Sequence, residues 1–272
     1  MTRDLLARYG GQALVTGASS GIGAVFAEEL ARRGFPLLLT ARREDRLEAL
    51  AERLRAEHRV GVEVLALDLA EPRASKRLID AVAQREIGLL VSNAGFGASG
   101  LFDEHDPARS ARMIRLHCGV TTALCHAFVP RMLARGRGGI VVVASIAGLQ
   151  PTPYFALYGA TKAFQVSLAE ALWQELRGTG VDVVALCPGT TRTEFAQLAH
   201  TREVGHGMEP LPVVRAALAR LGRGPSVVTG LQNRFSVALP RFLPRSWVAR
   251  ATGEVLARRL LGKPSWAVRR RR

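Results

Sequence analysis

The sequence predicts an α/β fold in which helices cover both faces of a parallel β-sheet. Two observations carry this prediction. Short apolar runs of strand length alternate with longer segments of helical periodicity, and nearly every run is followed by a turn of glycine or small polar residues. A chain of 272 residues suits one large domain and needs no disulfide or metal to stabilise its core. We expect a single domain over 1–272, with a core over 1–238, a lid at about 190–212, and a basic, amphipathic extension over 239–272.

Composition excludes several classes of protein. Hydrophobic residues make up 48% and charged residues 22% of the chain, as in ordinary globular domains. No apolar run reaches about 18 residues, so no transmembrane helix is predicted. The charged N-terminus lacks the apolar core of a secretory signal. Cys118, Cys125 and Cys187 form no CxxC pair and are expected to be reduced, buried thiols. The expected location is the cytoplasm.

The chain is strongly basic. Its formal net charge is +15, and most of its basic residues are arginines. Such a charge attracts nucleic acid, anionic lipid or phosphorylated ligands, although it can equally reflect the composition of the genome. No base-reading element or interleaved aromatic and basic surface stands out, so a specific nucleic-acid partner is not expected. The terminal run Arg269–Arg272 is interpreted as a solvated tail.

The first predicted strand, 12–15, leads into a glycine-rich turn. The turn, 16–23, reads TGASSGIG and is followed by a helical pattern over 24–33. Glycines let the backbone approach a phosphate closely, and the helix N-terminus offers unpaired N–H groups and a positive dipole end. The spacing is GxxxGxG rather than GxGxxG. Phosphate binding is favoured over an ordinary strand-to-helix turn, and the candidate residues are Gly17, Ser19, Ser20, Gly21, Ile22 and Gly23.

The second predicted strand, 36–40, indicates the cofactor type. The residue after this strand lies near the adenosine ribose in doubly wound folds. Here no carboxylate stands ready for the ribose hydroxyls, and Arg42 and Arg43 follow instead. Guanidinium groups suit bidentate contact with a 2′-phosphate. The pattern predicts NADP(H) as the preferred cofactor, with NAD(H) as the second choice. The alternative is that both arginines are simply solvated.

The next two strand ends supply further candidates. A helix over 44–57 precedes the strand 62–66, which ends at Asp68-Leu69. Asp68 could reach the adenine amino group or cap the following helix near 71–72, and these alternatives are equally supported. The strand 89–92 is followed by Asn93-Ala94-Gly95, small residues over which a cofactor could pass tightly.

A long helical segment over about 107–133 comes next, and Pro130 is expected to mark a break near its end. The strand 140–144 then delivers Ser145, and a helix running to about 177 carries Tyr158 and Lys162. Residues four apart share a helix face. An ammonium beside a phenol favours the phenolate, so Tyr158 is expected to become an acid/base group usable near neutral pH. Chance occurrence of the YxxxK spacing is the alternative.

The last predicted elements are two further strands of the sheet and the region between them. A strand over 181–187 ends at Pro188-Gly189, a polar and irregular region follows over 194–212, and 226–229 is the last strand. No spacing of histidines or carboxylates predicts a metal site. Because ligands of such folds bind at the carboxyl ends of the strands, the glycine turn, Arg42, Asp68, Asn93, Ser145 and Pro188 should gather at one edge of the sheet.

In this order, the motifs resemble the short-chain dehydrogenase/reductase family over about 12–229. They are Thr16-Gly17-xxx-Gly21-x-Gly23, Asn93-Ala94-Gly95, Ser145, Tyr158-xxx-Lys162, and Pro188-Gly189 with Thr193. The resemblance implies a Rossmann-like, doubly wound, parallel seven-stranded sheet of order 3-2-1-4-5-6-7, and NAD(P)-dependent carbonyl/alcohol chemistry. The stretch from Ala41 to Arg43 is similar to NADP-preferring members, and homodimers or homotetramers are usual.

The resemblance also implies roles for single residues. Tyr158 would exchange the proton, Ser145 would hold the substrate oxygen, and Lys162 would lower the tyrosine pKa and bind the nicotinamide ribose. The further cofactor candidates are Arg42, Arg43, Asp68, Leu69, Asn93, Ala94, Gly95, Tyr158, Lys162, Pro188, Gly189, Thr191 and Thr193.

His117 departs from the family pattern. The family commonly places an asparagine there, which is thought to hold a water that links the active lysine to solvent. A histidine also donates and accepts hydrogen bonds, so His117 is a fourth catalytic candidate. The alternative is a packed helix residue and a weakened relay, which would favour an NADPH-binding sensor with little turnover.

The candidate substrate pocket is mostly apolar. It is expected to contain Phe96, Leu149, Pro151, Tyr154, Phe155, Phe195 and Leu198, which suits a hydrophobic ketone or aldehyde, lipid-like or steroid-like. The segment 239–261 combines basic and apolar residues. Packing on its own domain is favoured. The alternative is a peripheral membrane contact through 239–272, which would make the protein a membrane-surface lipid or steroid carbonyl reductase.

Overall fold

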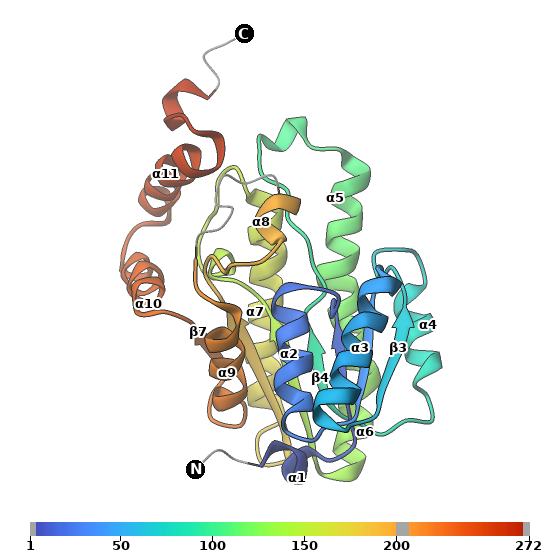
Figure 1. Ribbon diagram of the computed structural model, residues 1–272. Coiled ribbons are helices and arrows are strands. Elements are labelled where there is room, and N and C mark those ends of the chain that lie inside the picture. Colours follow the sequence, from blue (N-terminus) through green and yellow to red (C-terminus); the bar gives the residue numbers. More distant parts are fainter. Residues whose placement is uncertain (1–3, 200–206, 269–272) are drawn as a thin grey trace.

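A seven-stranded parallel sheet forms the centre of the protein. The computed structural model describes residues 4–199 and 207–268 (Figure 1). The strand order β3-β2-β1-β4-β5-β6-β7 confirms the predicted topology. Its strands are β1 (Gln12–Thr16), β2 (Leu37–Ala41), β3 (Val62–Ala66), β4 (Ile87–Ser92), β5 (Gly138–Val143), β6 (Val181–Cys187) and β7 (Ser226–Val228).

Apolar residues on both faces of each strand explain why the sheet lies between two helix layers. Along β1, Ala13 and Val15 belong to one hydrophobic cluster, whereas Leu14 belongs to the other. Side chains alternate between the faces of a strand. Full burial of a Leu or Val side chain stabilises the fold by about 1.5–3 kcal/mol. The doubly apolar strands therefore favour a sheet covered on both sides.

Helices cover both faces, as predicted (Figure 1). One face packs against α2 (Gly21–Ala31), α3 (Glu44–His58) and α9 (Pro210–Arg220). The other packs against α4 (Ala74–Ala81), α6 (Thr121–Arg135) and α7 (Ala156–Glu175). The remaining α-helices are α1 (Leu5–Tyr9), α5 (Pro107–Ile114), α8 (Phe195–Leu198), α10 (Leu231–Ala238) and α11 (Arg245–Leu256); π-helical turns span Arg115–Val120 and Ala257–Leu261, and 3₁₀ turns span Phe102–Glu104, Ile146–Gly148, Leu239–Phe242 and Ser265–Ala267.

The predicted helix break at Pro130 is wrong. A π-helical turn joins α5 to α6, and α6 continues through Pro130 to Arg135. A proline inside a helix costs about 3 kcal/mol because it removes one hydrogen bond and crowds the preceding turn. Leu124, Phe128 and Met132 are buried on the same helix, and their packing offsets that cost.

Other boundaries also differ from prediction. The chain forms α1 before it enters β1, and α4 begins at Ala74 rather than near residue 71. The region 194–212, expected to be irregular, contains α8 and the start of α9. Residues 200–206, the middle of the expected lid, lie outside the described residues.

The predicted C-terminal extension over 239–272 begins with a 3₁₀ turn and continues into α11. Leu243 adopts an extended conformation between the 3₁₀ turn and α11, because the residue before a proline is disfavoured in the α region and Pro244 follows. In Figure 1, α10 and α11 stand outside the two helix layers that cover the sheet. Among the described residues, no helix combines the length and apolar character needed to cross a bilayer.

Candidate active site

The glycine turn between β1 and α2 has a backbone that only glycines adopt readily. Gly17 and Gly21 have φ values of +68° and +58°, in the left-handed region. A Cβ at Gly23 would lie 2.3 Å from the Gly17 carbonyl oxygen. Ser20 precedes α2 without capping it through its side chain, and the first turn of α2 carries no acidic residue. The N–H groups at this end of α2 therefore suit an anionic ligand such as a phosphate.

Asn93 fastens this turn to the end of β4. Its side-chain amide donates to the carbonyl oxygens of Thr16 and Gly17 at 2.9 and 3.2 Å. In return, the Thr16 hydroxyl accepts from the N–H groups of Asn93 and Ala94 at 2.9 and 3.0 Å. Asn93 and Ala94 thus hold the glycine turn in shape. A glycine is needed at position 95 for a separate, steric reason, because a Cβ there would lie 2.8 Å from the His117 ring.

Of the two candidate arginines, Arg43 faces the glycine turn. Its guanidinium donates to the hydroxyls of Ser20 and Ser19 at 2.7 and 3.3 Å. It also pairs with Glu194 at 2.8 Å, and Arg46 binds the same carboxylate. Hydrogen bonds from Arg43 and Arg46 lower the Glu194 pKa. The Glu194 carboxylate therefore already pairs with the Arg43 guanidinium, close to the glycine turn, where an anion is favoured.

Arg42 and Asp68 lie on the other side of the β2 end. The Arg42 side chain is largely exposed and stands 4.0 Å from the Asp68 carboxylate. Asp68 accepts from the Ala70 N–H at 2.9 Å and pairs with Arg112 at 2.8 Å. Because Arg73 occupies the N-cap of α4, the hypothesis that Asp68 caps this helix is wrong. Asp68 forms a local turn and binds arginine instead. Leu69, beside it, is buried in the core.

Ser145, Tyr158 and Lys162 meet at the end of β5. Ser145 follows the strand and caps a 3₁₀ turn by accepting from the Ala147 N–H at 3.1 Å. Tyr158 and Lys162 lie one turn apart on α7, and the Lys162 ammonium is 5.6 Å from the tyrosine ring centroid. All three side chains are buried. The structure therefore brings the predicted trio together in one water-poor place.

The electrostatics of the trio differ from the expectation. Burial raises the pKa of Tyr158 above its ordinary value, and a hydrogen bond with Ser145 lowers it only in part. The expected shift of the Tyr158 pKa towards neutral pH is therefore wrong. Burial is also the main reason why the pKa of Lys162 falls to about 7. Tyr158 therefore keeps its proton at neutral pH, as a proton donor must.

Gln165 is the site residue that sequence reasoning missed. Its amide oxygen accepts from the Lys162 ammonium at 2.8 Å, and the Val143 carbonyl accepts from the same ammonium at 2.7 Å. The Gln165 amide nitrogen donates to the His117 carbonyl at 3.0 Å and to the Thr121 hydroxyl at 2.9 Å. The available signal was spacing, since residue 165 lies seven positions after Tyr158, two helical turns along the same face.

The His117 imidazole is fully buried, and both of its ring nitrogens form hydrogen bonds. Its Nε2 accepts from the Phe96 N–H at 3.1 Å, so Nδ1 carries the proton and donates to the Thr161 hydroxyl at 2.8 Å. Burial, and secondarily the Lys162 charge, lower the pKa of His117 well below its ordinary value. The ring is therefore neutral. His117 connects to Lys162 through its backbone carbonyl and Gln165, not through its ring.

Aromatic side chains enclose the tyrosine. The Phe155 ring stacks on Tyr158 with centroids 4.4 Å apart, and the Phe195 ring lies at 5.4 Å. Phe96 contacts the His117 ring edge-to-face at 6.0 Å. Among the other pocket candidates, Leu149 and Pro151 are half-buried, and Leu198 ends α8. The surroundings of Tyr158 are thus apolar.

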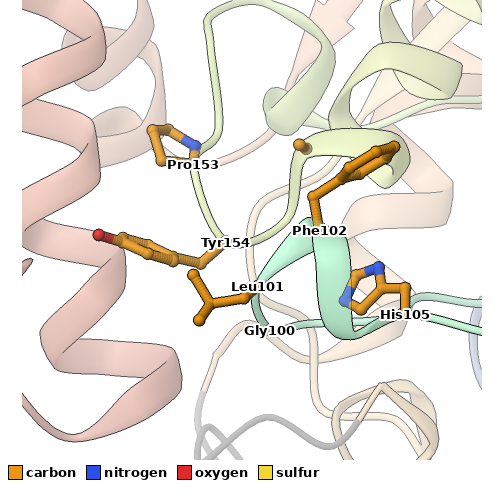
Figure 2. A pocket seen from close by; sticks show the side chains of 7 residues that line it. Gly100, Leu101, Phe102, His105, Pro153 and Tyr154 are labelled. Carbon is orange, nitrogen blue, oxygen red and sulfur yellow. The ribbon is translucent and has the colours of Figure 1, made fainter. Parts of the chain in front are cut away.

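A cavity of about 250 Å³ lies beside the start of α7, and we call it the second cavity to distinguish it from the surroundings of Tyr158. Its lining residues are Gly100, Leu101, Phe102, His105, Pro153, Tyr154 and Ala156 (Figure 2). In Figure 2, Tyr154 points away from Phe102 and His105, towards the neighbouring helix. Tyr154 has a φ of +63°, which is unusual for a bulky residue. Both ring nitrogens of His105 are buried without a hydrogen-bond partner among the described residues.

The turn after β6 closes the site on the glycine side. Thr193 lies over the glycine turn, because a Cβ at Gly21 would be 3.1 Å from the Thr193 Cβ. Thr191 forms a bridge with Met208 and donates to the Gly189 carbonyl at 3.1 Å. Pro188 accepts a long hydrogen bond of 3.5 Å from Ser145. Within 4–199 and 207–268, no group of three or more His, Cys, Asp or Glu side chains is placed to hold a metal ion.

Comparisons with known proteins agree with this geometry. The family model described as short chain dehydrogenase matches residues 12–203. The 7beta-hydroxysteroid dehydrogenase of Clostridium sardiniense is 31% identical over 230 residues, which cover 84% of this chain and 88% of that protein. A solved structure of a 7beta-hydroxysteroid dehydrogenase has a TM-score of 0.86 at 27% identity, covering 92% of this chain and all of the other.

A short-chain dehydrogenase from Sphingobium yanoikuyae, solved in complex with NADPH, has a TM-score of 0.78 at 36% identity. The match covers 87% of this chain and 97% of that one. The family model accounts for well over half of the chain, and it contains the glycine turn, Ser145, Tyr158 and Lys162. On this evidence the chain belongs to the short-chain dehydrogenase family.

Proposed function

We propose that this oxidoreductase, which interconverts CH–OH and C=O groups, prefers NADP(H) and acts on a hydrophobic ketone or aldehyde and the corresponding alcohol. The observation that carries the proposal is the buried trio: a protonated Tyr158 hydrogen-bonded to Ser145, with the Lys162 ammonium one helical turn away. The aromatic residues around Tyr158 indicate the character of the substrate.

The residues at the sheet edge fit a dinucleotide. The glycine turn would hold the pyrophosphate at the N-terminus of α2, since a side chain at Gly23 would collide with the backbone. Thr193 and the Asn93-Ala94-Gly95 turn would border the cofactor on either side. NADPH, when bound, supplies the hydride for carbonyl reduction.

Three side chains of the protein would bind the carbonyl oxygen of the substrate and supply its proton. Tyr158, kept protonated by its burial, would donate its proton to that oxygen as negative charge develops. Ser145 would hold the oxygen by a hydrogen bond from a fixed position, because its hydroxyl oxygen accepts from the Ala147 N–H. Lys162 would stabilise the tyrosinate that forms, from an ammonium positioned by Val143 and Gln165.

Arg43 supports the choice of NADP(H) over NAD(H). Its guanidinium lies on the two serines of the glycine turn, and it already binds an anionic group, the Glu194 carboxylate. A 2′-phosphate would compete with Glu194 for this guanidinium. The neighbour solved with NADPH is consistent with this choice.

The substrate class is proposed from the walls of the site. Phe155 and Phe195 border Tyr158, and Ala156, two residues before Tyr158, lines the second cavity. A carbonyl compound with a bulky apolar body would place its oxygen at Tyr158 and its body against these walls. Two of the similar proteins are named for a hydroxysteroid, which supports the size and polarity of such a substrate.

The test follows NADPH absorbance with a panel of aldehydes and ketones, from small aliphatic to steroid-sized, with NADH and Tyr158→Phe in parallel. We expect turnover with the bulky apolar members, and its loss in Tyr158→Phe with NADPH binding retained, because the phenylalanine keeps the ring packing. Fluorescence titration with NADPH provides the binding control. Binding of NADPH without turnover across the panel would instead support a sensor with little catalysis.

A further inference from the structure

Apolar side chains are exposed in an unusual concentration at the C-terminal end of the chain. We define the C-terminal segment as residues 231–268, which contain α10 and α11. Eight of the thirteen exposed large apolar side chains of the described residues lie in this segment: Leu231, Phe235, Leu239, Phe242, Leu243, Trp247, Val255 and Trp266. Phe242 is 86% and Phe235 75% exposed. Apolar surface gathered in this way marks an interaction site more often than scattered exposed residues do.

The exposed apolar residues follow helical spacing, so the feature is ordered. Leu231, Phe235 and Leu239 are four residues apart along α10 and the turn after it, and such residues share a face. The opposite side of the segment packs inward, since Val237, Val248 and Leu260 are buried. One apolar face thus anchors the segment to the protein and a second apolar face is left to solvent.

The C-terminal segment is rich in positive charge. Residues 231–268 contain seven Arg or Lys residues and one acidic residue, Glu254. Arg245 and Arg250, on either side of Trp247, are exposed, and the structure assigns them no ion pair among the described residues. Two identical faces of this kind would repel each other in a symmetric pair. An anionic surface complements them.

The segment also adjoins the active site at two places. A Cβ at Gly253 in α11 would lie 3.4 Å from Pro153, which lines the second cavity. A Cβ at Gly189, after β6, would lie 2.3 Å from the Asn233 amide of α10. The C-terminal segment therefore packs against the segments that border the substrate and cofactor.

We propose that the C-terminal segment docks this protein on an anionic lipid bilayer, with Phe235, Phe242 and Trp247 entering the interface and the arginines binding the headgroups. Aromatic and basic side chains are the residues that amphipathic helices use for such contacts. The bilayer contact stands independently of catalysis. Combined with the proposed function, it would let an apolar carbonyl compound reach Tyr158 from the membrane.

The test is co-sedimentation of the full chain, without cofactor or substrate, with vesicles of phosphatidylcholine alone or mixed with phosphatidylglycerol. We expect binding to the anionic vesicles that weakens as salt is raised, and little binding to the neutral ones. The double variants Phe242→Ser/Trp247→Ser and Arg245→Glu/Arg250→Glu should each lower the partition coefficient by about tenfold or more.

Matched controls change similar residues elsewhere. Ile114→Ser/Leu133→Ser alters two exposed apolar residues of α5 and α6, and Arg77→Glu alters an exposed arginine of α4; both should bind as the unmodified chain does. Thermal melting verifies that each variant is folded. The emission of Trp247 and Trp266, which are 62% and 64% exposed, should shift to the blue on anionic vesicles.

Absence of binding at low salt, or equal loss in the control variants, would overturn the proposal. A second outcome would also overturn it. If the unmodified chain sediments as a dimer in analytical ultracentrifugation, and Phe242→Ser/Trp247→Ser converts it to a monomer without any lipid binding having been seen, then the outward face is covered by a second copy of the chain.

Discussion

The side-chain amide of Gln165 joins Lys162 to His117. Its oxygen accepts from the Lys162 ammonium at 2.8 Å, and its nitrogen donates to the backbone carbonyl of His117 at 3.0 Å. The lysine that stands beside the candidate catalytic tyrosine is thus held by two fixed acceptors, the Val143 carbonyl and the Gln165 amide. Since Lys162 and Gln165 are both buried, this amide is a large part of what replaces water around the ammonium.

Gln165→Leu is expected to reduce kcat/KM for carbonyl reduction at pH 7 by roughly 10- to 100-fold, because a hydrogen bond to a charged group contributes about 1.5–3 kcal/mol. The loss would arise from a smaller fraction of charged Lys162. Gln165→Glu, by contrast, places a carboxylate beside the ammonium and should move the alkaline limb of the pH profile upward. The measurement is kcat/KM against pH for both variants.

Gln174→Leu is the matched control, because Gln174 is exposed on the same helix. A merely structural role for Gln165 would lower the activity of both Gln165 variants and leave the position of the alkaline limb unchanged. That result would remove Gln165 from the list of positioning residues.

The pH dependence of carbonyl reduction should come from Lys162, whose pKa is about 7. Below this pH the ammonium is present, and above it the amine is neutral, so kcat/KM for the cofactor is expected to fall as pH rises through about 7. NADH is the better probe, because its ribose carries no 2′-phosphate that titrates in the same range. Tyr158, with its raised pKa, stays protonated throughout this window.

The lowered pKa of Lys162 also predicts that the folded protein becomes more stable as pH rises, whereas its activity is expected to fall. The unfolded chain binds a proton at Lys162 up to its ordinary pKa of 10.5, whereas the folded chain releases it near pH 7. Between these values the unfolded state binds more protons, so this group makes the protein more stable as pH rises. Lys162→Met should remove this contribution, which urea unfolding at pH 7 and pH 9 would detect; an unchanged difference between the two would contradict the assignment.

The family resemblance implied the sheet order, and short local signals were sufficient for the alternation of strands and helices and for the placement of the trio. Apolar runs predict strands, and residues that follow parallel strands meet at one edge. Tyr158 and Lys162 needed only helical spacing. The Pro130 break and the start of α4 were wrong because they depend on tertiary packing, which outweighs local propensity.

The pKa values of the site residues depend on burial, which local sequence patterns do not predict. A lysine near a tyrosine was expected to lower its pKa, yet removal of both from water has the larger effect. His117 was considered for a proton relay from its ring chemistry. Its ring nitrogens instead bind Phe96 and Thr161, contacts that only the folded structure could reveal.

Cofactor preference should depend more on Arg43 than on Arg42. Arg43 binds the serines of the glycine turn and Glu194, whereas the exposed Arg42 stands 4.0 Å from Asp68. We expect Arg43→Gln to lower kcat/KM with NADPH by about 10- to 100-fold, the value of one or two charge-assisted hydrogen bonds, and to change the value with NADH by much less. Arg42→Gln is the matched comparison and should have the smaller effect.

Glu194→Gln tests the same site from the other side. Removing the carboxylate frees the guanidiniums of Arg43 and Arg46, so KM for NADPH should fall while KM for NADH stays nearly constant. Should Arg43→Gln weaken both cofactors equally, Arg43 supports the glycine turn alone and the 2′-phosphate lies elsewhere.

His105 is expected to select substrates that carry a second polar group. Its two ring nitrogens are buried without a partner among the described residues, and it lines the second cavity beside the apolar residues Leu101 and Phe102 (Figure 2). A buried polar atom without a hydrogen bond costs about 1–3 kcal/mol, and a hydroxyl or carboxylate on the substrate body would offset that cost. His105→Leu should therefore raise KM by about fivefold or more for a hydroxylated bulky ketone. For the unsubstituted ketone of the same size KM should stay equal or fall, because leucine fills the wall without an unpaired nitrogen. The comparison of these two substrates is the measurement, and a parallel rise in both KM values would show that residue 105 shapes the cavity rather than binding a polar group.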